Sequence, residues 1–258
     1  MIALSVNVNK VATLRNSRNG REPSVLQAVR MCIEAGAPGI TVHPRADERH
    51  IRRSDVLEIA ASLEDVAPDG VRPEFNIEGD PRSDLISLVL NAQPDQCTLV
   101  PVVPGEVTSQ AGWSQSTEPR DLRRIVRRLR DAGIRVSLFI DPEPEAVRWA
   151  ADRGADRVEL YTEPYAAAFA RNVEEGRRAF EKYAAAARLA HEFGLGVNAG
   201  HDLDLTNLAL FRELPFLAEV SIGHALVSRA LFVGLDTVVR EYLAVLAGGD
   251  AAPPSGTV

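Results

Sequence analysis

The chain is poor in cysteine, and it has neither a long apolar run nor an excess of positive charge. Its two cysteines, Cys32 and Cys97, lack the spacing of metal ligands, which favours buried free thiols in a cytoplasmic protein. No apolar segment approaches the ~20 residues that span a membrane, and the first residues lack the pattern of a signal peptide. The net charge of −7 argues against general affinity for nucleic acid or anionic lipid. We therefore expect a cytoplasmic protein that binds neither nucleic acid nor membrane.

What the sequence does contain is a regular alternation of β-rich and helical segments. Between 120 and 132, Leu122, Ile125, Val126 and Leu129 recur at helical spacing and form one apolar face. Alternating strands and helices predict an α/β protein with one domain, a parallel (β/α)8 or TIM barrel over 1–246. The remaining residues, 247–258, are expected to be a disordered tail. The predicted strands lie at 4–9, 39–43, 73–78, 96–101, 135–141, 157–162, 195–201 and 219–224.

Two sequence signatures of other α/β folds are missing. An open doubly wound sheet is the structural alternative, but the first strand-to-helix turn lacks the G-x-G-x-x-G fingerprint of dinucleotide-binding folds. Amidohydrolase-like barrels carry His-x-His on their first strand, where this chain has Asn7-Val8-Asn9. We therefore expect no catalytic metal.

One face of most predicted strands is polar. Side chains alternate along a strand, so the apolar set should pack on the helices while the other set points into the barrel. Burying unpaired polar groups costs ~1–3 kcal/mol each, so the interior should hold a hydrogen-bonded network or a wet pocket. Enzymes with this fold place their sites at the carboxyl ends of the strands. The inward positions are Ser5, Asn7, Asn9, Thr41, His43, Asn76, Glu78, Glu159, Tyr161, Asn198, Ser221 and Gly223.

Histidines and glutamates gather at these strand ends. A single histidine there is usually a structural hydrogen-bonder, but His43, His201 and His224 are three of only five in the chain, which favours a function. Glu78 and Glu159 point inward and suit general-base or cation-stabilising roles.

The last two strands end in similar dipeptides, Gly200-His201 and Gly223-His224. This corner of the barrel commonly binds phosphate. Because the residues from Ala225 onward are predicted to be helical, free N–H groups at the start of that helix could contact a phosphate.

Six motifs together resemble the pyridoxine 5'-phosphate synthase family of vitamin B6 biosynthesis, in register with all eight strands. They are VNVNKVATLRNSR (6–18), GITVHPRADERHI (39–51), FNIEG (75–79), VELYTEPYA (158–166), VNAGHDL (197–203) and SIGHA (221–225). The resemblance implies a (β/α)8 barrel that assembles into a homo-octamer and uses no cofactor. It also implies a condensing transferase that joins 3-amino-2-oxopropyl phosphate to 1-deoxy-D-xylulose 5-phosphate, giving pyridoxine 5'-phosphate, phosphate and water.

The resemblance also implies residue roles. His43 and Glu78 match the family's proton acceptors, His201 its proton donor, and Glu159 a residue that stabilises the transition state. Contacts to the amino ketone phosphate are implied for Asn7, Arg18, Asp202, Gly223 and His224. Contacts to the deoxyxylulose phosphate are implied for Asn9, Lys10, Arg45, His50 and Thr108.

Two positions depart from the commoner family pattern. Many members have Asp-His where this chain has Asn9-Lys10, and Asp202 stands where glycine is commoner. Lys10, one of only two lysines, has three interpretations. It forms a Schiff base with a substrate ketone, supplies a point charge to the deoxyxylulose phosphate, or is simply exposed.

Two other functions remain open at this level. One is another phosphosugar enzyme on the same barrel, such as an isomerase or epimerase with a Glu/His pair. The other is a non-catalytic protein that binds a phosphorylated metabolite. The segment 103–118 is long for a barrel loop, which predicts a lid over the site.

Overall fold

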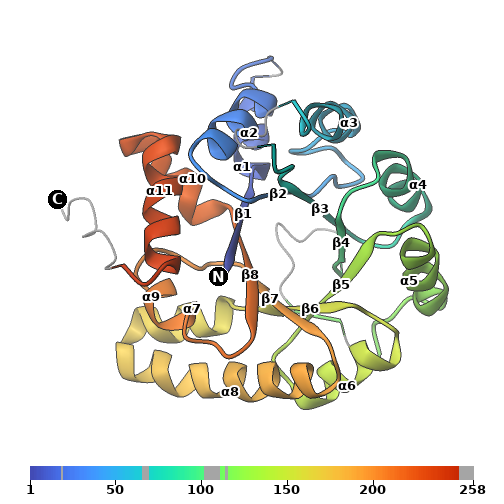
Figure 1. Cartoon of the computed structure of the whole chain (residues 1–258), viewed down its shortest axis with the longest axis vertical. Helices are drawn as coiled ribbons and strands as arrows, with labels where there is room; N and C mark the ends of the chain where they lie inside the picture. Colours follow the sequence, from blue (N-terminus) through green and yellow to red (C-terminus); the bar gives the residue numbers. More distant parts are fainter. Residues whose placement is uncertain (19, 66–69, 102–110, 114–115, 250–258) are drawn as a thin grey trace.

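The computed structural model describes residues 1–18, 20–65, 70–101, 111–113 and 116–249. Its strands pair in parallel in chain order, and β8 closes on β1, so the predicted single-domain (β/α)8 barrel is confirmed (Figure 1). Every predicted strand is present, with ends that differ by one or two residues. The strands are β1 (Ala3–Asn7), β2 (Gly39–Val42), β3 (Glu74–Gly79), β4 (Gln96–Leu99), β5 (Arg135–Ile140), β6 (Arg157–Tyr161), β7 (Gly196–Gly200) and β8 (Leu217–Ile222).

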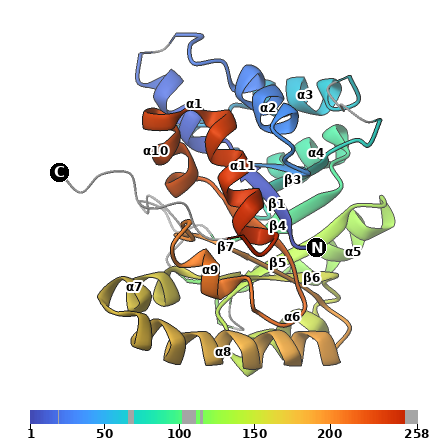
Figure 2. The ribbon, with the colours of Figure 1, turned by 60° about the vertical axis from the view of Figure 1, so that its left-hand side comes forward.

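Helices surround the barrel, and α8 crosses beneath α7 along one side (Figures 1 and 2). Among the described residues, no helix has both the length and the apolar character needed to cross a membrane. The helices are α1 (Asn9–Asn16), α2 (Val25–Glu34), α3 (Arg53–Ser62), α4 (Ser83–Ala92), α5 (Leu122–Asp131), α6 (Pro144–Asp152), α7 (Glu163–Arg171), α8 (Val173–Glu192), α9 (Leu208–Phe211), α10 (His224–Val233) and α11 (Leu235–Leu246).

The apolar core lies between the strands and the helices, as the alternation predicts. Leu4, Val6, Ile40 and Phe75 are each fully buried, and each such side chain contributes about 1.5–3 kcal/mol of transfer free energy. The two cysteines are also buried free thiols, as expected.

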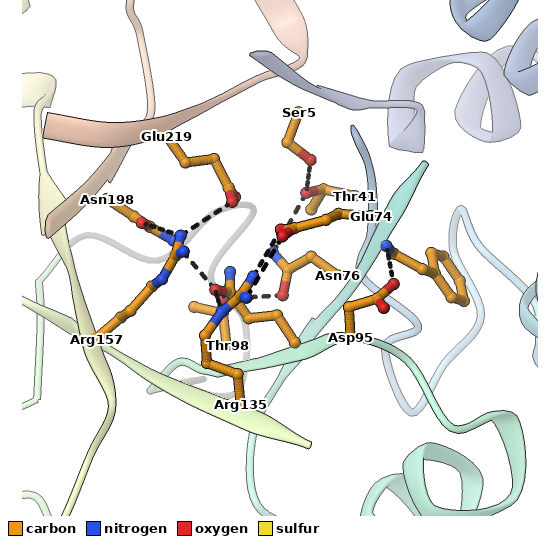
Figure 3. A network of polar contacts seen from close by, with 12 residues as sticks. Ser5, Thr41, Glu74, Asn76, Asp95, Thr98, Arg135, Arg157, Asn198 and Glu219 are labelled. Atoms are coloured by element: carbon orange, nitrogen blue, oxygen red, sulfur yellow. Dashed lines mark hydrogen bonds and ion pairs between the residues drawn. The ribbon is translucent and has the colours of Figure 1, made fainter. Parts of the chain in front are cut away.

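The barrel interior is a hydrogen-bonded polar network rather than an apolar filling (Figure 3). The Ser5 and Thr41 hydroxyl oxygens lie 2.6 Å apart, Asn76 Nδ2 donates to Thr41 Oγ1 at 3.2 Å, and Thr98 Oγ1 donates to Asn76 Oδ1 at 3.0 Å. These groups are almost completely buried. Their mutual bonds offset the desolvation that unpaired hydroxyl and amide groups would incur.

A second layer, made of charged residues, lies near the amino-terminal ends of the strands (Figure 3). Arg157 Nη1 donates to Asn198 Oδ1 at 3.0 Å and lies 3.4 Å from Glu219 Oε2. Arg135 forms an ion pair with Glu74 at 2.6 Å. The sequence analysis did not identify Glu219, because its partners come from strands distant in sequence.

The first strand is shorter than predicted, which moves Asn9 from a strand into a helix. Asn7 Oδ1 accepts a hydrogen bond from the Asn9 backbone N–H at 3.1 Å, and such an Asx-type contact ends a strand in a turn. Helix α1 therefore begins at Asn9, and Lys10 lies in its first turn.

Candidate functional site

A cavity of about 300 Å³ opens at the carboxyl ends of the strands, where barrel enzymes place their sites. Most of the sequence-predicted site residues line it, and they lie at or just after the ends of five strands, β1, β2, β3, β7 and β8. Those that line the cavity are Asn7, Asn9, Lys10, His43, Arg45, His50, Glu78, His201, Asp202, Gly223 and His224.

Two of the predicted residues that the structure describes do not line this cavity. Glu159 is buried beneath it, and Arg18 lies exposed in the turn after α1. Thr108, and most of the predicted lid 103–118, lie outside the described residues.

Glu78 is the acidic centre of the cavity. It is 4% exposed at the end of β3, where Asn7 Nδ2 donates to Oε2 and Ser221 Oγ to Oε1, both at 3.4 Å. Burial raises the pKa of Glu78 to about 8, the Ser221 hydrogen bond opposes this, and the nearby Glu219 carboxylate adds to it. A carboxyl group with such a pKa can accept and return a proton near neutral pH.

His43 faces Glu78 across the cavity. Its Nδ1 lies 3.8 Å from Glu78 Oε2, too far for a direct hydrogen bond. Burial and then the nearby His50, Arg45, His201 and Arg82 hold the pKa of His43 well below its usual value. Its Nε2 is buried and has no hydrogen-bond partner among the described residues. A neutral imidazole with a free nitrogen is suited to accept a proton.

The main chain at His43 and Pro44 is held by hydrogen bonds with two side chains. Its backbone N–H donates to Asn9 Oδ1 at 2.9 Å, so Asn9 binds protein as well as lining the cavity. On the other side, Arg82 Nη2 donates to the carbonyl of Pro44 at 2.7 Å. Sequence reasoning missed Arg82, because only the fold brings the loops after β2 and β3 together.

His50 belongs to the cationic side of the cavity. Its Nδ1 accepts a hydrogen bond from the Ile51 backbone N–H at 3.0 Å, so the neutral ring carries its proton on Nε2. Burial, followed by the charges of Arg45, Lys10 and Arg49, lowers the pKa of His50 to about 4. His50 is therefore a neutral N–H donor, and Lys10 and Arg45 line the cavity with it.

His201 packs against aromatic rings at the ends of β5 and β6. Its ring centroid lies 4.8 Å from that of Phe139 and 5.8 Å from that of Tyr161. Burial lowers the pKa of His201, which the Asp202 carboxylate partly opposes. Its buried Nδ1 has no hydrogen-bond partner in the described structure. Sequence patterns do not single out Phe139, because an apolar inward residue resembles ordinary barrel filling.

His201 and Asp202 both have left-handed backbone conformations, with φ of 80° and 57°. Non-glycine residues adopt this region at a cost, and such strain often occurs at functional sites. Thr162 Oγ1 donates to the Gly200 and His201 carbonyls, and Asn207 Nδ2 donates to the Asp202 carbonyl at 3.0 Å. These bonds hold the turn in place.

Glu159 lies directly below this turn. A Cβ at Gly200 would lie 2.7 Å from Glu159 Oε1, so glycine at this position leaves room for the carboxyl group where it lies. Burial, and then Glu78 and Glu219, raise the pKa of Glu159 well above its usual value. Neither carboxyl oxygen has a hydrogen-bond partner among the described residues.

Gly223 and His224 form the wall beside β1, at the start of α10. A Cβ at Gly223 would meet Asn7 Cβ and the Asn7 carbonyl oxygen at 3.0 Å. The predicted helix after the eighth strand is present, and its first N–H groups have no intrahelical acceptor. This wall therefore offers backbone donors to an anion.

No group of three or more His, Cys, Asp or Glu side chains in the described part of the chain is placed to hold a metal ion. The cavity combines two kinds of groups. Its His and Glu side chains can accept and donate protons, and its backbone N–H groups and cationic side chains can bind anions.

The chain matches the family described as "Pyridoxal phosphate biosynthesis protein PdxJ" over residues 4–248. It is 50% identical to a pyridoxine 5'-phosphate synthase of Porphyromonas gingivalis over 243 residues, covering 94% of this chain and 98% of the relative. It is 49% identical to the protein of that name from Leptospira biflexa over 257 residues, covering 97% and 99%.

Solved structures of low identity share the fold alone. A thiamine phosphate pyrophosphorylase from Pyrococcus furiosus superposes with a TM-score of 0.60 at 13% identity, covering 95% of this chain and 96% of the other. A phosphoribosyl anthranilate isomerase from Thermus thermophilus superposes with a TM-score of 0.58 at 15% identity, covering 95% and 98%.

Proposed function

We infer that this chain, which belongs to the PdxJ family of pyridoxal phosphate biosynthesis proteins, is a pyridoxine 5'-phosphate synthase. The relatives that carry this name match it at about half identity over nearly their whole length. The observation that carries the assignment is the placement of Glu78, His43 and His201 around one cavity between N–H and cationic groups.

We propose that the substrates are 3-amino-2-oxopropyl phosphate and 1-deoxy-D-xylulose 5-phosphate. The deoxyxylulose phosphate would bind on the side of Lys10, Arg45 and His50, where cationic and N–H donors complement a phosphate. The amino ketone phosphate would bind against the start of α10, with Gly223 and His224. Asn7 and Asp202 also line the cavity and would complete the second contact set.

The reaction requires several proton transfers around one carbon skeleton. The amine adds to the ketone, water leaves, and phosphate and a further water are then lost through enamine-like steps. Glu78 and His43 would accept protons in these steps, and His201 would donate one to a leaving group. Glu159 would act from below, on charge that develops in the transition state.

The unequal environments of these groups support this division of roles. Glu78 has a raised pKa of about 8, so it can carry a proton during turnover, whereas the lowered pKa of His43 leaves a neutral acceptor. Groups whose environments shift their pKa values in opposite directions often serve as the acids and bases of an active site.

A direct assay with both substrates tests the proposal. Purified protein should form pyridoxine 5'-phosphate and inorganic phosphate only when both substrates are present. Turnover of one phosphosugar alone would instead indicate an isomerase or epimerase. Tight binding of either compound without any turnover would indicate a binding protein.

We further propose that the protein is cytoplasmic and assembles into a homo-octamer, as its family resemblance implies. Leu231 and Phe232 at the end of α10 are 69% and 83% exposed, and Leu14 on the neighbouring α1 is 51% exposed. Such apolar side chains are better accommodated in an interface than in water. Light scattering coupled to size-exclusion chromatography tests the assembly.

The assignment of Arg18 to the amino ketone phosphate remains a proposal, which an Arg18→Ala variant would test by its KM.

A further inference from the structure

Arg15 is a buried cation just outside the cavity. It lies in the last turn of α1 and is 5% exposed. Its Nη1 and Nη2 bind the two carboxyl oxygens of Asp55 at 2.6 and 2.9 Å. Asp55 Oδ2 also accepts the Arg52 backbone N–H at 2.7 Å, so the pair joins α1 to the start of α3.

The same guanidinium reaches the loop that carries His50. Arg15 Nη2 donates to the His50 carbonyl at 3.2 Å, and Asn16 Nδ2 donates to that oxygen at 2.8 Å. Arg15 Nε donates to Asn16 Oδ1 at 3.0 Å, and Asn16 Nδ2 also reaches the Glu48 carbonyl at 3.2 Å. Arg15 and its neighbour therefore hold two carbonyl groups of one short loop.

This loop determines where the His50 ring lies. The His50 side chain is tied to its own backbone through the Nδ1 contact with the Ile51 N–H. Fixing the carbonyl and the following N–H therefore fixes the ring and directs its Nε2. The ring centroid lies 5.9 Å from that of His43, in an edge-on arrangement. A shift of the loop would thus move a cavity donor.

Stability alone is a weak explanation for this buried pair. Desolvation offsets most of the attraction in a buried ion pair, and apolar residues of similar volume often serve as well. An apolar residue could not donate the additional hydrogen bonds to the His50 carbonyl and to Asn16 Oδ1. The fork geometry of arginine allows all of these bonds at once.

We propose that Arg15 is a positioning residue for the sugar-phosphate half of the active site, acting through the His50 carbonyl. The proposal rests on the function proposed above. Arg15 itself does not line the cavity, so its effect must pass through the loop. The amino ketone half should not depend on it, because the hydrogen bonds of the Arg15 side chain among the described residues do not reach Gly223 or His224.

Arg15→Lys is the sharpest test, because it keeps the charge beside Asp55 but cannot also reach the His50 carbonyl. We expect KM for deoxyxylulose phosphate to rise by about 10-fold, since small misplacements of positioning groups have effects of this size or larger. KM for the amino ketone phosphate should not change. If both constants are unchanged, or if both rise equally, the proposal is wrong.

Arg72→Lys is the matched control. Arg72 also forms a two-bond pair with an aspartate, Asp95, at 2.6 and 2.8 Å, and that aspartate also accepts a backbone N–H, from Phe75. This pair precedes β3 and β4, at the end of the barrel away from the cavity. Its variant should lower Tm without changing either KM, whereas a selective rise like that of Arg15→Lys would overturn the proposal.

Two further measurements cover the remaining outcomes. If Arg15→Lys does not fold, Asn16→Ala removes the second donor to the His50 carbonyl and must show the same selective rise in KM. If the wild-type protein makes no pyridoxine 5'-phosphate, the proposed function fails, while the inference is decided by a crystal structure of Arg15→Lys. A displaced His50 ring supports it, and an unmoved ring overturns it.

Discussion

His43 Nδ1 and Glu78 Oε2 lie 3.8 Å apart across the cavity, close enough to interact but not hydrogen-bonded to one another. The pair comes from the ends of the adjacent strands β2 and β3, which are held in register by the barrel. Because the two groups do not share a proton through a hydrogen bond, each can exchange a proton separately with neighbouring atoms of one substrate.

We expect His43→Asn and Glu78→Gln each to fold normally and to lower kcat by about 100-fold or more, as the loss of a general base should. Steady-state assays with both substrates, together with circular dichroism, measure this. Glu74→Gln is the matched control, because Glu74 begins the same strand but pairs with Arg135 at the far end of the barrel. A variant with wild-type kcat would remove that residue from the mechanism.

The rate should rise with pH as Glu78 loses its proton. Because burial and the Glu219 carboxylate raise the pKa of Glu78 to about 8, the ascending limb of kcat/KM against pH should lie well above the usual carboxyl range. Glu219→Gln removes one raising charge, so this limb should move to lower pH. A pH–rate profile of both proteins measures the shift, and a limb that stays in place would show that Glu219 has no influence on Glu78.

The same carboxyl group should make the fold less stable as pH rises. Because the pKa of Glu78 in the folded protein is about 8, against an ordinary glutamate pKa of 4.5, the folded state binds more protons than the unfolded state between these values. Stability is therefore greatest at the acid side of this window and falls towards pH 8. Glu78→Gln should flatten this part of the curve of unfolding free energy against pH. Denaturant titrations of both proteins across the window check it, and identical slopes would contradict the assignment.

Inorganic phosphate should compete with the amino ketone phosphate at the start of α10. Free N–H groups of the helix and the close approach at Gly223 make this wall suited to an anion. A crystal soaked in phosphate should show it beside Gly223 and His224. Density elsewhere in the cavity, with none at this wall, would mean that the assignment is wrong. Gly223→Ala should weaken this competition, because its Cβ would press on Asn7.

The fold and much of the site follow from local patterns in the sequence. Alternation along each strand correctly separated the polar inner face, with residues such as Asn76 and Glu78, from the apolar outer face. Strand ends then placed His43 and His201 at one mouth, because parallel strands share an edge. The motif resemblance supplied the substrates and the residue roles, which the patterns alone leave open.

The remaining features depend on contacts between distant segments or on local turns. The bond from Arg15 to Asp55 spans 40 positions. No periodic pattern in the sequence indicates that these two residues are in contact. Strand β1 ends at Asn7 because its own side chain accepts the Asn9 N–H, a local competition that β-propensity does not reveal. Arg18 ends a motif whose residues Asn7, Asn9 and Lys10 line the cavity, yet it lies exposed in the turn after α1.

Lys10 lines the cavity from the first turn of α1, and its charge contributes to lowering the pKa of the neighbouring His50. We propose that this lysine supplies a point charge for the deoxyxylulose phosphate, and the kinetics of a variant distinguish this role from that of a merely exposed lysine. We expect Lys10→Met to weaken the apparent affinity for that substrate by about 10-fold, or about 1.4 kcal/mol. The amino ketone phosphate should be affected less.

Lys182→Met is the control for this change, because Lys182 is the only other lysine in the sequence and pairs with Glu143 on the surface. It should leave both apparent affinities unchanged.

Because the substrate's own amine can form the imine, borohydride should trap no substrate adduct on Lys10. An adduct at Lys10, found by mass spectrometry of peptides, would instead establish covalent catalysis by a Schiff base. Unchanged kinetics in Lys10→Met would show that the charge has no part in binding.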